Sequence, residues 1–135
     1  MKKIKNLTDR RGKRFTAGDQ ASEGTDDCHP AFSFEHMVTT HSVERCEKEE
    51  IVSLSMALYK LSQLTWKQIK SAHRHGMGFE KLPTTCIKAS IPNIVTPDVN
   101  LLAFRFHGKK PMVGFRSGQV FYIIWLDRDY SLYEH

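Results

Sequence analysis

Residues 100–129 read NLLAFRFHGKKPMVGFRSGQVFYIIWLDRD, and this stretch decides the fold. It contains three apolar segments, at 100–106, 111–116 and 119–126, and a glycine stands in each of the two short gaps between them. Connections this short force successive strands to run antiparallel. The stretch therefore predicts an antiparallel meander. Its last strand is apolar on both faces, which places that strand in the centre of the sheet or beneath helices.

Two helices are predicted ahead of the meander. Apolar residues recur at helical spacing between residues 43 and 61. A second helix is expected over 66–75, because Thr65 and Gln68 match a capping box. A short strand is expected at 85–91. Two helices packed on a three- to four-stranded antiparallel sheet make an α+β fold.

Residues 1–30 are polar and are expected to form a disordered arm, with residues 31–135 as the folded domain. Residues 1–15 hold seven basic residues and one acidic residue, for +6, whereas the remainder holds 13 basic and 14 acidic residues, for −1. Such an arm attracts phosphate backbones without reading sequence, although it is equally typical of a solvated tail. The basic residues of the arm that are expected to contact RNA are Lys2, Lys3, Arg10, Arg11, Lys13 and Arg14.

The composition narrows the class of protein. No apolar run approaches the roughly 20 residues that a membrane-spanning helix needs, and the basic N-terminus is not followed by the apolar stretch of a secretory signal. The three cysteines are an odd number without close spacing, which favours a reducing compartment. We therefore expect a cytoplasmic protein with no membrane partner, no metal and no cofactor.

Polar side chains cluster where the strands of the meander end. In an antiparallel meander the end of the third strand returns to the first hairpin, so residues 127–135 could lie beside Arg105 and His107. The candidate catalytic residues are Arg105, His107, Arg116, Tyr133 and His135. The candidate RNA-binding residues in this region are Lys109, Lys110 and Arg128.

These residue types suit one chemistry in particular. Arginine and lysine hold phosphate, histidine moves a proton near neutral pH, and tyrosine positions a substrate. No serine or cysteine stands in a recognisable nucleophile motif. RNA supplies its own nucleophile, the 2′-hydroxyl, so such a set could cleave RNA without a metal. The same residues are also what ordinary solvated strand ends contain.

The order of these elements, with LTW at 64–66, GMGFEKL at 76–82 and the meander, resembles the RelE/ParE superfamily of small toxins. Arg105 is similar to an arginine on the corresponding strand of that family. Tyr133 and His135 resemble the carboxy-terminal His-Tyr pair of its YoeB branch. The resemblance implies the toxin component of a toxin-antitoxin system, an endoribonuclease that cuts mRNA. Its implied partners are RNA or the ribosome and a cognate antitoxin.

Two other interpretations remain open at the level of sequence. ParE-type members share the fold without ribonuclease activity, so the chain could be a non-catalytic interaction protein that binds a protein partner or nucleic acid. It could also be an accessory protein without a site. The residues do not decide between His107 and His135 as the proton carrier, and they do not predict the RNA target or the oligomeric state.

Overall fold

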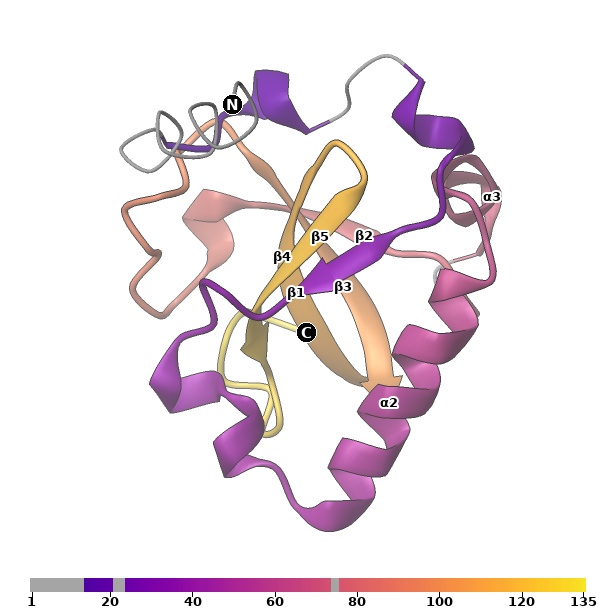
Figure 1. The fold of residues 1–135 in the computed structure, drawn as a ribbon. Coiled ribbons are helices and arrows are strands. Elements are labelled where there is room, and N and C mark those ends of the chain that lie inside the picture. Colours follow the sequence, from indigo (N-terminus) through magenta and orange to yellow (C-terminus); the bar gives the residue numbers. More distant parts are fainter. Residues whose placement is uncertain (1–13, 21–23, 74–75) are drawn as a thin grey trace, which may run out of the picture.

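The computed structural model describes residues 14–20, 24–73 and 76–135, which fold around one five-stranded sheet. The strands lie in the order β1-β5-β4-β3-β2 across the sheet (Figure 1). Their bounds are β1 Ala31–Ser33, β2 Glu80–Pro83, β3 Asn100–His107, β4 Lys110–Ser117 and β5 Val120–Leu126. β1 runs parallel to β5, and the other neighbouring strands are antiparallel.

The meander expected from residues 100–126 is confirmed as β3, β4 and β5. Gly108 has a φ of 57° in the β3–β4 turn, and Gly118 has a φ of 59° in the β4–β5 turn. Glycine adopts this left-handed backbone without steric cost, so both hairpins close within two residues. The α+β class is confirmed as well.

The sheet is mixed and larger than the three- to four-stranded antiparallel sheet that was predicted. β1 adds a parallel edge of three residues, with Ala31 opposite Val120. The second addition is β2, which pairs with β3 and ends at Pro83, a residue that an edge strand tolerates.

The strand predicted at 85–91 is wrong. Thr84–Cys86 forms a 3₁₀ turn, and residues 87–91 lie outside the sheet. The apolar side chains that suggested a strand, among them Ile87 and Ile91, pack onto the face of the sheet instead. The alternation of apolar and polar residues does not distinguish a strand within the sheet from a loop that packs on its face.

The first predicted helix is α2, Lys48–Ser62, which begins five residues later than expected. A separate 3₁₀ turn at Val43–Arg45 precedes it, because the Ser42 hydroxyl accepts from the backbone N–H of Glu44. A capping box of Glu47 and Glu50 then starts α2. Within the described residues, no helix is both long and apolar enough to cross a membrane.

The second predicted helix is α3, Trp66–Ser71, and its expected start is confirmed. The Thr65 hydroxyl accepts from the backbone N–H of Gln68 at 3.2 Å, and the Gln68 side chain accepts from the Thr65 N–H at 2.9 Å. The helix ends earlier than residue 75, because Ala72 is extended and its N–H bonds back to Ile69.

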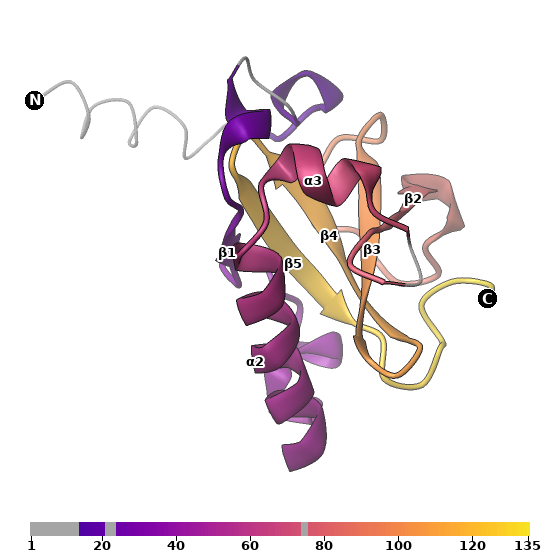
Figure 2. The same cartoon turned by 90° about the vertical axis from the view of Figure 1, so that its right-hand side faces the viewer.

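The sheet is buried on both faces. α2 and α3 cover one face, whereas the segment 84–99 and the C-terminal tail lie on the other (Figure 2). The helix-side core contains Leu54, Leu61, Trp66, Ile69, Leu102, Phe104, Phe106, Met112, Phe121, Ile123 and Leu126. The loop-side core contains Leu82, Val95, Val99, Leu101, Ala103, Val113, Phe115, Ile124, Trp125, Leu132 and Tyr133.

Part of the expected arm contacts the domain. The ring of Phe15 lies 4.7 Å from that of Phe115, and its backbone bridges to Val95. The Arg14 guanidinium donates to the carbonyl oxygens of Asn93 and Val95. Arg14 therefore anchors the chain here, because two backbone acceptors engage the group that was expected to contact RNA. The other arm residues expected to bind RNA, Lys2, Lys3, Arg10, Arg11 and Lys13, lie outside the described residues.

Candidate functional site

A pocket of about 370 Å³ opens where β3, the β3–β4 turn and the C-terminal tail meet. We call it the tail pocket, and we call residues 127–135 the tail. The pocket is lined by Glu80, Ala103, Phe104, Arg105, Lys109, Pro111, Tyr130, Tyr133, Glu134 and His135. Four of the predicted site residues are thus brought together: Arg105, Lys109, Tyr133 and His135.

The sheet and its first hairpin supply the cations of the pocket. Arg105 comes from β3, and Lys109 comes from the turn that Gly108 makes possible. Among the residues that the structure describes, neither Arg105 nor Lys109 forms an ion pair. Both are therefore available to an anion that enters the pocket.

A buried carboxylate shapes the tail. Asp127 is fully buried, and its Oδ1 accepts from the backbone N–H groups of Ser131 at 3.0 Å and Leu132 at 3.2 Å. These bonds fold the tail back immediately after β5. A turn therefore follows β5 directly, and Leu132 and Tyr133 enter the loop-side core.

The same carboxylate holds the imidazole of the tail. Nε2 of His135 lies 3.1 Å from Oδ2 of Asp127. A carboxylate only accepts hydrogen bonds, so Nε2 is the nitrogen that donates and Nδ1 is left to exchange a proton. The rings of Tyr133 and Tyr130 lie 4.1 Å and 5.0 Å from the His135 ring and fix its orientation further.

The environment of Tyr133 keeps its hydroxyl protonated. Burial raises the pKa of Tyr133 to about 12, and the carboxylates of Glu80 and Asp127 act in the same direction. Arg105 acts in the opposite direction but is outweighed. At neutral pH the phenol is thus a hydrogen-bond donor rather than a base.

An ion pair ties the tail to the segment 84–99. Lys88 Nζ lies 2.7 Å from a carboxylate oxygen of Glu134, and the Lys88 backbone N–H donates to Leu132 at 2.7 Å. The Lys88 hydrogen bond lowers the pKa of Glu134. The pocket thus holds two cations, Arg105 and Lys109, and two carboxylates, Glu80 and Glu134, of which Glu134 is paired with Lys88.

His107, the other histidine predicted for the site, lies elsewhere. The pairing of β3 with β4 shifts register between Arg105 and His107. This bulge turns His107 towards α2, where its Nδ1 is 2.7 Å from the Ser53 hydroxyl. The expectation that the tail lies beside both Arg105 and His107 is therefore wrong for His107, because the extra residue breaks the alternation of side chains along β3.

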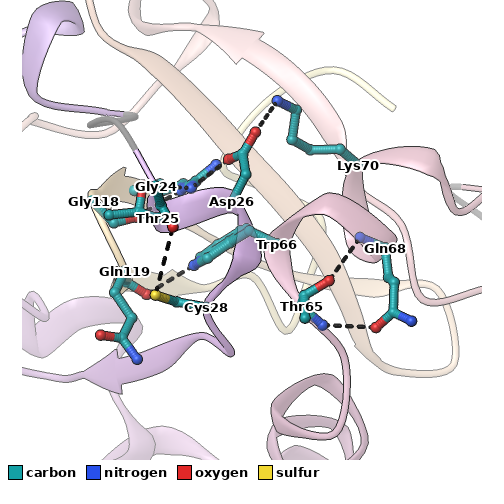
Figure 3. Close-up of polar contacts among 11 residues, drawn as sticks. Gly24, Thr25, Asp26, Cys28, Thr65, Trp66, Gln68, Lys70, Gly118 and Gln119 are labelled. Atoms are coloured by element: carbon teal, nitrogen blue, oxygen red, sulfur yellow. Dashed lines mark hydrogen bonds and ion pairs between the residues drawn. The ribbon is translucent and has the colours of Figure 1, made fainter.

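Arg116 is also removed from the site. It is 5% exposed and lies at the far end of β4, where it forms an ion pair of 2.7 Å with Asp26. Figure 3 shows that Asp26 is also paired with Lys70 of α3, at 2.9 Å. The Arg116 guanidinium also donates to the Gly118 carbonyl and stacks 4.3 Å from the Trp66 ring. These bonds attach the segment around Asp26 to the sheet, which makes Arg116 structural.

Lys110 and Arg128 bind a buried carboxylate instead of RNA. Glu50 of α2 is 3% exposed and accepts from Lys110 Nζ at 2.8 Å and from Arg128 Nε at 2.5 Å. Each of these cations was predicted to contact RNA. Both cations are instead paired with Glu50. The cluster of Glu50, Lys110 and Arg128 joins the start of α2 to the first hairpin and the tail.

The three carboxylates of the site, Asp127, Glu80 and Glu134, were given no role from the sequence. Asp127 follows an apolar strand directly, and a carboxylate at the end of a buried strand was the available signal. Glu80 carries no local signal, because it reaches the pocket only through the pairing of β2 with β3.

Within the described residues, no group of three or more histidine, cysteine, aspartate or glutamate side chains is placed to hold a metal ion. The three cysteines are free thiols. The chain matches no protein-family model, no curated protein and no solved structure at a significant level.

Proposed function

We propose that the tail pocket binds and cleaves RNA without a metal, as the ribonuclease of a toxin-antitoxin system would. One observation carries the proposal: Arg105 and Lys109, which form no ion pair among the described residues, line the same pocket as His135, whose imidazole is held by the buried Asp127. Guanidinium and ammonium groups complement a phosphodiester, and a histidine fixed by a carboxylate is a common proton carrier. Among the described residues, no other pair of cations both lacks an ion pair and shares a pocket with a histidine that a carboxylate holds.

The absence of a protein nucleophile in this site favours RNA over DNA as substrate. No serine, threonine or cysteine lines the pocket. In RNA the 2′-hydroxyl attacks the adjacent phosphorus, so the protein needs only a base, an acid and positive charge. The products of such a reaction are a 2′,3′-cyclic phosphate and a free 5′-hydroxyl.

The residues of the pocket divide this reaction among them. His135 Nδ1 takes the proton of the 2′-hydroxyl, and the new bond forms between the 2′-oxygen and phosphorus. Arg105 and Lys109 stabilise the charge that develops on the phosphoryl oxygens. The bond to the 5′-oxygen breaks, and the protonated hydroxyl of Tyr133 supplies the proton to that leaving group. Asp127 positions His135 and stabilises the imidazolium.

A non-catalytic interaction protein is the second candidate, and exposed apolar residues on α2 favour it. Val52, Met56 and Tyr59 are exposed and follow i, i+4, i+7 spacing on one side of the helix. A protein partner could pack on this stripe. In the toxin proposal that partner is the cognate antitoxin, the location is the cytoplasm, and mRNA on the ribosome is the target.

The test uses point variants, because removal of Tyr133–His135 would also remove a buried ring from the loop-side core. Purified protein is incubated with single-stranded RNA in the presence of a chelator, and the product ends are identified. Arg105→Ala and His135→Gln should each lower the cleavage rate by roughly 100-fold or more while the melting temperature stays close to that of the wild type.

Two controls separate catalysis from folding. Arg116→Ala should lower the melting temperature, because it leaves Asp26 and the Gly118 carbonyl without their partner. Lys81→Ala, on the exposed side of β2, should change neither quantity. Cleavage that survives in Arg105→Ala, or that also occurs at a 2′-deoxy linkage, would contradict the proposed reaction.

A further inference from the structure

Tyr130 has a backbone conformation that tyrosine rarely adopts. Its φ is 60°, and among the described residues it is the only one other than glycine with a positive φ. A side chain in this left-handed region clashes with its own backbone, which is why glycine or asparagine usually occupies such positions.

The turn around Tyr130 is held by the carboxylates on either side of Arg128. Asp127 accepts from the N–H groups of Ser131 and Leu132, and Asp129 accepts from the Ser131 hydroxyl at 2.6 Å. These bonds would form equally well with glycine at position 130. The strain therefore comes with the phenol ring and not with the turn.

The ring of Tyr130 does little for the core. It is 43% exposed, and it stands edge-on to His135 with ring centroids 5.0 Å apart. It lines the tail pocket together with Arg105 and Lys109. A strained residue that displays an aromatic ring in the same pocket as Arg105 and Lys109 is more readily explained by a ligand than by stability.

We propose that Tyr130 is a stacking platform for an unpaired nucleobase next to the phosphate held by Arg105 and Lys109. This inference rests on the proposed function and specifies its substrate as single-stranded RNA. Aromatic rings stack on any base, since every base has a π-face, and this contact contributes about 1–3 kcal/mol per base. In a duplex the bases are paired and stacked on each other, so no base has a free face that could stack on the ring of Tyr130.

The test measures binding separately from cleavage. The probe is a short single-stranded RNA with 2′-deoxy substitution at the cleaved linkage and 2-aminopurine at one base, whose fluorescence falls when it stacks. Wild-type protein should quench the probe. Tyr130→Phe and Tyr130→Trp should bind within about threefold of the wild type, whereas Tyr130→Ala and Tyr130→Gly should lose roughly 5- to 100-fold in affinity together with the quenching.

Comparison of the alanine and glycine variants tests the strain. Both lack the ring, but only glycine relieves the left-handed backbone. The folding equilibrium constant of Tyr130→Gly should exceed that of Tyr130→Ala by about fivefold in urea unfolding. Equal stability of these two variants would overturn the claim that a side chain at position 130 strains the backbone.

The outcomes distinguish this inference from the proposed reaction. Wild-type affinity in Tyr130→Gly, or an equal loss of affinity for duplex and single-stranded RNA, overturns the stacking platform even if cleavage is observed. If the wild-type protein quenches the probe but cleaves no RNA, the proposed ribonuclease activity is refuted and the stacking role of Tyr130 is still supported.

Discussion

Glu50→Gln should remove a buried charge on which three parts of the fold converge. Burial by itself would raise the pKa of Glu50. Hydrogen bonds from Lys110, the Glu47 backbone and Arg128 outweigh burial and bring the pKa from 4.5 to about 2. Three donors thus favour the ionised form, and the free energy of unfolding should depend on that ionisation.

The size of the effect follows from the change in pKa. A difference of about 2.5 between the two pKa values, at about 1.4 kcal/mol for each unit, corresponds to about 3.5 kcal/mol as an upper estimate, and we expect about 3 kcal/mol. Because the pKa is depressed in the folded protein, this stabilisation is fully present above about pH 4.5 and is lost as the pH falls towards about 2.

The assay is urea unfolding of the wild type and Glu50→Gln at a series of pH values. The difference in free energy of unfolding between them should be about 3 kcal/mol at neutral pH and should shrink as the pH falls from about 4.5 to about 2. Glu49→Gln is the matched control, since Glu49 is the exposed neighbour on the same helix, and it should stay near the wild type throughout. A difference that stays constant over this pH range would refute the reasoning, because the loss would then come from packing.

Three further predictions test other parts of the fold. Thr65→Ala should lower the stability by about 1 kcal/mol, seen in the melting temperature, because the N-terminal cap of α3 is lost. Gly114→Ala should prevent folding or lower the melting temperature severely, because its Cβ would lie 1.8 Å from the Tyr122 carbonyl oxygen; a melting curve like that of the wild type would mean that the β4–β5 pairing, whose register shifts between Val113 and Gly114, moves to make room. Removal of residues 1–13 should leave the melting temperature unchanged but reduce the salt dependence of RNA binding, whereas Phe15→Ala should lower the melting temperature with the salt dependence intact.

The Glu50 cluster also links stability to the proposed site. Arg128 belongs to the tail, so its bond to Glu50 holds the start of the turn that carries Tyr130 and His135. Glu50→Gln should therefore affect RNA cleavage although Glu50 does not line the pocket. This effect would arise because the tail, and with it Tyr130 and His135, is held less firmly in place. The cleavage rate should therefore recover at saturating RNA.

Much of the candidate site could be predicted from the sequence because it depends on a local hairpin. The meander of residues 100–126 and its glycine turns bring the tail back to β3, which placed Arg105 and Lys109 near Tyr133 and His135. His107, Arg116, Lys110 and Arg128 were assigned by residue type and proximity along the strand. Their actual partners lie on α2 and near Asp26, distant segments that no local pattern connects to them.

The sequence by itself determined the elements whose signals are local: the three strands of the meander, the capped start of α3 and the apolar faces that make both cores. Tertiary structure alone decided what depends on pairing between distant segments. The parallel β1 edge, the pairing of β2 in place of residues 85–91 and the bulge that turns His107 to Ser53 belong to this second group. The physical reason is that side-chain periodicity specifies which surface must be buried. The register of each strand and the segment that it pairs with depend on which distant segments bury that surface best.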